Sequence, residues 1–138
     1  MNITSKQKTR QAKNPTLTLL TSDFTISNMP SKVFSAALTG LNAQIVEVEV
    51  DACYGLPSFN IVGLPDKAIQ ESKDRVASAI KSSGFQSPHQ QPIRTLVSLA
   101  PADLKKEGSL YDLPISLGFL FATKQIKFDF QSRIFVGE

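Results

Sequence analysis

A charged loop joins two apolar segments in the sequence Ala100-Pro-Ala-Asp-Leu-Lys-Lys-Glu-Gly-Ser-Leu-Tyr-Asp-Leu-Pro-Ile-Ser-Leu117. The segment before it, residues 93–99, alternates apolar and polar positions, which is typical of a strand with one buried face. The segment that begins within it, residues 115–122, is apolar on nearly every side, which indicates a buried helix. Loops in such positions often carry the working surface of proteins that combine strands and helices. We therefore look for functional residues here first.

The end of this loop carries signals for the start of a helix. Asp112 is a good N-cap, because its carboxylate can accept hydrogen bonds from the free N–H groups of the first turn. Pro114 falls in that first turn, where its missing N–H costs least. We predict a helix over residues 112–123 with Asp112 as its structural cap, and Gly118 allows that helix to approach the sheet closely.

Upstream, residues 43–51 show the clearest strand pattern in the chain. Val46, Val48 and Val50 share one face, and the acidic side chains of Glu47, Glu49 and Asp51 share the other. Acids two residues apart on a strand lie about 7 Å apart, and no histidine stands beside them, so we predict a solvated face and no metal site. Residues 33–38 predict an earlier strand, and Cys53 is interpreted as a small core residue.

A turn, a strand and a helix are predicted between these segments. Gly55-Leu-Pro57 predicts a turn, and residues 58–62 return as a short strand. Pro65 and Asp66 then signal a helix that ends at Gly84 and whose apolar side contains Ile69, Val76, Ala77 and Ile80. Residues 134–136 predict the start of one more strand, and the abrupt end at Glu138 leads us to expect a domain that is cut there.

Length and composition fit one domain with a single core, since the chain has 138 residues, 41% hydrophobic and 20% charged. The net charge is +3, but residues 1–22 contain four basic residues and no acid, so the rest is slightly acidic. We predict a disordered basic extension over residues 1–30 and a folded domain over residues 31–138. No apolar run is long enough for a membrane span or a secretory signal, and a single cysteine forms no internal disulfide, so we expect a cytoplasmic protein with no membrane partner.

Common catalytic motifs are absent from the sequence. It has no G-x-x-x-x-G-K-[ST], CxxC, HExxH or G-x-S-x-G, and the single histidine, His89, has no visible partner in the sequence. A Ser–Lys hydrolase would need Ser109 beside a lysine that takes its proton, and Lys105 and Lys106 are the nearest candidates. Nothing in the sequence positions either of them, so a Gly-Ser turn is the favoured interpretation. We predict no catalytic, cofactor-binding or metal-binding residue.

Four phrases resemble the N-terminal domain of the ComM/YifB family, a group of bacterial AAA+ proteins often described as magnesium-chelatase ChlI-like. They are Tyr54-Gly-Leu-Pro-Ser-Phe-Asn-Ile-Val-Gly-Leu-Pro65, Glu71-Ser-Lys-Asp-Arg-Val-Ala-Ser-Ala-Ile80, Ser98-Leu-Ala-Pro-Ala-Asp-Leu-Lys-Lys-Glu-Gly108 and Tyr111-Asp-Leu-Pro-Ile115. The resemblance covers residues 33–138. It implies an α+β fold, a mixed β-sheet backed by helices, of the ribosomal protein S5 domain 2-like or Lon-protease-domain-like kind.

The resemblance also implies the context of the domain. Its parent would be a hexameric helicase that drives DNA branch migration in natural transformation and recombination. The ATP and Mg²⁺ sites would lie in an ATPase domain beyond this chain. The partners would be the rest of the same polypeptide and the neighbouring subunits of the ring, with DNA as a further candidate.

Similar Lon proteases carry their serine in a loop of the form K-D-G-P-S-A-G. Counting from Lys106 places that position on Leu110 and not on Ser109, and the partner lysine would lie beyond Glu138. The resemblance therefore implies a non-catalytic accessory domain. Its candidate contacts to a neighbouring subunit or to DNA lie on the exposed loop: Lys105, Lys106, Glu107, Ser109 and Tyr111.

Two alternatives remain open from the sequence. A Ser–Lys peptidase using Ser109 predicts labelling of that residue by a serine-reactive probe. A nucleic-acid-binding module acting through the basic tail predicts an affinity that falls steeply with salt and disappears when residues 1–22 are deleted.

Overall fold

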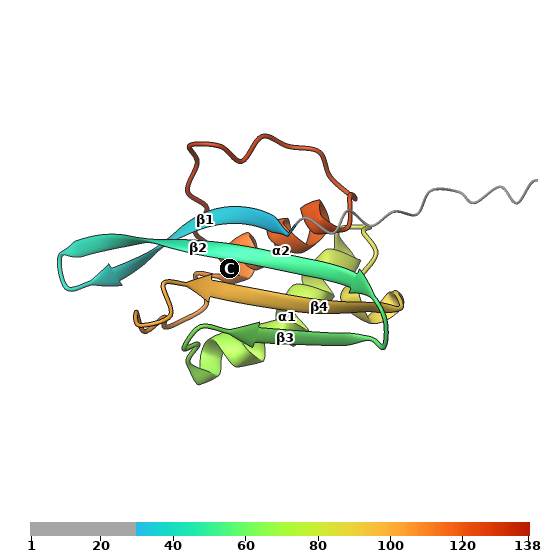
Figure 1. The fold of residues 1–138 in the computed structure, drawn as a ribbon, viewed down its shortest axis with the longest axis horizontal. Coiled ribbons are helices and arrows are strands. Elements are labelled where there is room, and N and C mark those ends of the chain that lie inside the picture. Colours follow the sequence, from blue (N-terminus) through green and yellow to red (C-terminus); the bar gives the residue numbers. More distant parts are fainter. Residues whose placement is uncertain (1–29) are drawn as a thin grey trace, which may run out of the picture.

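A mixed sheet of four strands organises residues 30–138, the part of the chain that the computed structural model describes (Figure 1). The strands lie in the order β1-β2-β4-β3, and β3 and β4 are parallel while the other neighbours are antiparallel. The elements are β1 (Ser31–Thr39), β2 (Asn42–Tyr54), β3 (Ser58–Val62), α1 (Lys67–Ser82), the 3-10 turn η1 (Pro88–Gln90), β4 (Ile93–Ala100) and α2 (Asp112–Ala122). The predicted α+β class with a mixed sheet is confirmed. The predicted disordered basic extension lies outside the described residues.

The alternation in β2 fixes which face of the sheet is buried. Val46, Val48 and Val50 are fully buried, as predicted, while the acids between them stay partly exposed on the opposite face. On that face Lys32 of β1 pairs with Glu47 at 2.7 Å. Within residues 30–138, no group of three or more His, Cys, Asp or Glu side chains is placed so that it could hold a metal ion. The prediction of Cys53 as a core residue is wrong, because this residue lies half-buried on the polar face of the sheet.

Strand β3 does not pair with β2, although only a short turn separates them. The N–H of Gly55 donates to the carbonyl of Pro92 at 2.9 Å, which brings the start of β4 beside the end of β2. Strand β4, which follows the crossover through α1, therefore takes the place next to β2, and β3 lies beyond β4 and parallel to it. The outer edge of β3 is partly covered, because the side-chain amide of Gln70 donates to the carbonyl of Ile61 at 3.2 Å. Such covering limits the pairing of the edge with other chains.

Helix α1 follows the sequence prediction closely. The Asp66 carboxylate caps it by accepting from the N–H of Ile69 at 2.8 Å, and Gly84 follows its last turn with a positive φ of 82°. The predicted apolar side is buried against the sheet. The Arg75 guanidinium on this helix turns toward α2.

Helix α2 crosses the sheet at close range, and both helices cover the same face (Figure 1). Ile115 and Phe119, which both belong to α2, are fully buried. A Cβ atom on Gly118 would lie 2.6 Å from Cγ2 of Val50, so the predicted close approach is confirmed. The remaining residues 123–138 run back along β1, where the N–H of Phe135 donates to the carbonyl of Phe34 at 2.8 Å. The strand predicted at residues 134–136 is therefore reduced to a single bridge.

No helix within residues 30–138 combines the length and apolarity needed to cross a bilayer.

Candidate functional site

The loop of residues 101–111 does not present its predicted contact residues on one surface. Lys105 and Glu107 are exposed, and Ser109 is half-buried. Lys106, Tyr111 and Asp112 are buried. The prediction of Lys106 as an exposed contact is therefore wrong, and so is that of Tyr111.

Lys106 is the most deeply buried charged residue among residues 30–138, with none of its surface exposed. Its ammonium donates to the carbonyl of Gly63 at 3.0 Å and to that of Pro101. Burial lowers the pKa of Lys106 below its ordinary value, and the negative charge of Asp103 opposes this only in part. The ammonium thus ties the turn before α1 to the loop after β4, and it is not available to a phosphate group. The sequence could not reveal this, because Lys105 and Lys106 look alike in a charged loop.

Asp66 joins the same two segments from the other side. One carboxylate oxygen caps α1, and the other accepts from the N–H of Gly108 at 3.1 Å. The N–H of Asp66 also donates to the carbonyl of Lys106 at 3.2 Å. The sequence identified Asp66 as a helix start but gave no sign of its second role, since the two partners are 42 residues apart.

Gly63 explains why this junction is so tight. It adopts a positive φ of 100°, and a Cβ atom at this position would lie 2.1 Å from the carbonyl oxygen of Leu99. A side chain does not fit there, and the left-handed conformation favours glycine independently. The turn of residues 63–66 is therefore packed against β4, and its exposed member is Leu64.

Ser109 is not paired with a lysine. Its hydroxyl donates to a carboxylate oxygen of Glu138 at 2.9 Å, while the ammonium of Lys106 is held by main-chain carbonyls. Lys105 pairs with Glu107, and this hydrogen bond and the attraction between the charges raise the pKa of Lys105. These contacts give neither lysine the position of a general base toward Ser109.

Asp112 is the first residue of α2 and not its N-cap. The N-cap is Tyr111, which makes no side-chain capping bond, so the predicted cap is wrong by one residue. The Asp112 carboxylate instead receives two hydrogen bonds from Arg75, from Nε at 2.7 Å and from Nη2 at 3.1 Å. Asp112 is 5% exposed, and the hydrogen bond to it raises the pKa of Arg75. This ion pair fastens α1 to α2 across 37 residues of sequence, a relation that no local pattern indicates.

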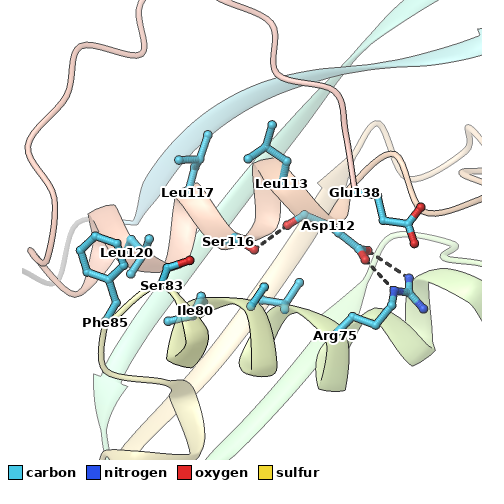
Figure 2. Close-up of a pocket in the computed structure, with 12 residues that line it drawn as sticks. Arg75, Ile80, Ser83, Phe85, Asp112, Leu113, Ser116, Leu117, Leu120 and Glu138 are labelled. Carbon is cyan, nitrogen blue, oxygen red and sulfur yellow. Dashed lines mark hydrogen bonds and ion pairs between the residues drawn. The ribbon is translucent and has the colours of Figure 1, made fainter.

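An apolar groove of about 400 Å³ lies between the two helices, and Figure 2 shows it with Arg75, Asp112 and Glu138 together at one end and Phe85 at the other. The lining between the ends is mostly aliphatic: Val76, Ala79, Ile80, Leu113, Leu117 and Leu120, with Ser83 and Ser116. The helical pattern of the sequence predicted two buried faces but not the space left between them.

The arrangement is suited to holding segments together and to contacting another surface. Lys106, Asp66, Arg75 and Asp112 are each bound to another part of this domain. The described residues bring together no cluster of metal ligands. The turn at Gly63 directs its carbonyl at Lys106 and does not present a row of N–H groups there. Lys105 and Glu107, together with Asp103, remain as the charged, exposed part of the loop.

Comparison with known proteins agrees with the fold. The family described as subunit ChlI of Mg-chelatase matches residues 48–138. Competence protein ComM of Haemophilus influenzae is 46% identical over 94 residues, which is 68% of this chain and 18% of that protein. The uncharacterized protein YifB of Escherichia coli is 45% identical over 96 residues, 70% of this chain and 18% of that protein.

A protein of Mycobacterium tuberculosis described as uncharacterized is 39% identical over 108 residues, which is 78% of this chain and 21% of that protein. The chain thus spans about a fifth of the length of the curated relatives that it matches. Together with the match over most of the described residues, these identities show that the chain belongs to the ComM/YifB family of magnesium-chelatase-related proteins.

Proposed function

We propose that this chain is a non-catalytic accessory domain of a ComM/YifB-type AAA+ ATPase, and that its parent is a hexameric helicase that drives DNA branch migration in natural transformation and recombination. The name of the Haemophilus relative, a competence protein, supports this setting. ATP and Mg²⁺ would bind in another domain of the parent. The domain would act through contacts with the rest of its own polypeptide and with neighbouring subunits.

The observation that carries the non-catalytic role is the way in which the polar groups of the loop are used. The Lys106 ammonium holds two carbonyls together, and the Ser109 hydroxyl is bound to Glu138. Both groups build the loop, and neither is placed to act on a substrate. A rigid loop with an exposed charged tip suits recognition of another surface.

The charges of that tip favour a protein partner over DNA. Lys105 and Glu107 pair with each other, so the exposed tip offers no excess of positive charge to a phosphate backbone. A neighbouring subunit can replace this internal pair by two pairs across an interface. We therefore place subunit contact ahead of DNA contact.

The test exchanges these charges in the full-length protein, as Lys105→Glu combined with Glu107→Lys. The exchange keeps the net charge, and we expect it to weaken ring assembly and to lower branch migration of a synthetic four-way junction, while nucleotide binding by each subunit persists. Ring assembly is measured by light scattering after size-exclusion chromatography.

The matched control is the exchange of Lys67 and Glu71, an exposed pair on α1. An equal loss in the control would refute a specific role of the loop. Labelling of Ser109 by a serine-reactive probe, absent in Ser109→Ala, would favour the peptidase alternative instead.

A further inference from the structure

The groove between α1 and α2 leaves aliphatic side chains in contact with solvent on a surface that the described chain does not fill. Leu113 is 38% exposed and Leu117 is half-buried, and both belong to the lining. The charged groups stand together at one end, and Ser83 and Ser116 are the polar groups between the ends, so an occupant of this groove needs mostly apolar side chains.

The last residues of the chain are fixed at one end of this groove. The N–H of Gly137 donates to the carbonyl of Leu110 at 3.0 Å, and the carbonyl of Gly137 accepts from the N–H of Leu113 at 3.0 Å. Glu138 lies in the wall of the groove beside Arg75 (Figure 2). Its carboxylate accepts a hydrogen bond from the Ser109 hydroxyl at 2.9 Å. The backbone that would follow Glu138 therefore starts from a held position next to apolar surface.

The length of the relatives provides chain to occupy the groove. The matched part is only 18% of the Haemophilus protein, and the family match runs to residue 138. From Leu113 to Leu120 the helix rises about 10 Å, at 1.5 Å per residue. Three or four residues of extended chain, at about 3.3 Å each, are enough to follow it.

We propose that the residues directly after Glu138 in the full-length polypeptide lie in the groove between α1 and α2 and close it with apolar side chains. The occupant is thus the same chain and not a second copy. This inference rests on the proposed function, in which the chain is one domain of a longer protein. In this arrangement, the groove is the surface through which this domain is joined to the rest of that protein.

The experiment places the photoreactive amino acid p-benzoylphenylalanine at Leu117 of the full-length protein. Illumination followed by mass spectrometry is expected to give cross-links to the residues directly after Glu138. Mixing isotope-labelled and unlabelled protein separates links within one chain from links between chains. The same probe at Ser78, an exposed position of α1 outside the groove, is the control and should give no such link.

Cross-links between different chains would overturn the proposal and assign the groove to a second copy. Cross-links to parts of the same chain far from residue 138, or no cross-link from Leu117 at all, would overturn it as well. If the Leu117 variant fails to fold, the probe at Leu113, which is more exposed, decides the question. A cross-link within the chain together with absent branch migration would leave this inference standing while the proposed function fails.

Discussion

The substitution Lys106→Met tests whether a buried ammonium holds this domain together. Methionine keeps most of the volume and removes the donor, so the carbonyls of Gly63 and Pro101 lose their shared partner. A buried carbonyl without a donor costs about 1–3 kcal/mol. The carbonyl of Pro101 still accepts from the N–H of Leu104 at 3.4 Å, so this cost falls mainly on the carbonyl of Gly63. Part of this cost is recovered, because the folded protein no longer buries a charge.

We expect a net loss of about 2 kcal/mol in the free energy of unfolding, which corresponds to a thermal midpoint lower by about 7 °C for a domain of this size. Urea unfolding followed by circular dichroism measures the loss, and Lys105→Met is the matched control. Lys105 is exposed and its pair with Glu107 lies at the surface, so its midpoint should hardly move. Equal midpoints for the two variants, or a Lys106→Met protein more stable than the parent, would refute the reasoning.

Three further tests concern the packing of α2. Gly118→Ala brings a methyl group within 2.6 Å of Val50, and the shift of the helix should cost about 1–2 kcal/mol after the gain in helix propensity. Adding Val50→Ala should make the combined loss smaller than the sum of the two single losses, and strict additivity in urea melts would contradict the described contact. Arg75→Met should lower the urea midpoint more than Asp112→Asn does. The first substitution leaves a buried carboxylate unpaired, whereas the second leaves a guanidinium that water can reach. The reverse order of the two midpoints would exclude the described ion pair. Burial raises the pKa of Tyr111, so the stability linked to its proton is complete below pH 10 and is lost as the pH rises through the folded pKa. Tyr111→Phe should therefore lose less stability than the parent between pH 10 and 11.5. Identical slopes of unfolding free energy against pH for the two proteins would disprove the burial.

The sequence could predict those parts of the fold that depend on neighbours along the chain. The alternation around Val48 gave the buried face of β2, and the signals at Asp66 and Gly84 gave both ends of α1. The position of Gly118 in an apolar helix gave the close approach to the sheet. Each of these features depends on local periodicity or on the conformation of one residue.

The features that failed depend on partners far away in the sequence. Lys106 was predicted on the surface because its two carbonyl partners come from separate segments, one of them 43 residues earlier. Asp112 was predicted as a cap because capping is the local use of a carboxylate, but Arg75 competes for it and prevails with two hydrogen bonds. The candidate site is built almost entirely from such pairs, so the sequence located the loop but not its construction.

Because β4 lies between β2 and β3, it determines the order in which the sheet can form during synthesis. A nascent polypeptide that has emerged from the ribosome up to Ser82 holds β1, β2, β3 and α1, but not β4, the one strand within residues 30–138 beside which β3 lies. Until residues 93–100 leave the exit tunnel, Phe59 and Ile61 have no sheet to join. During that interval the growing chain exposes an unpaired apolar strand, which is the kind of surface that promotes aggregation.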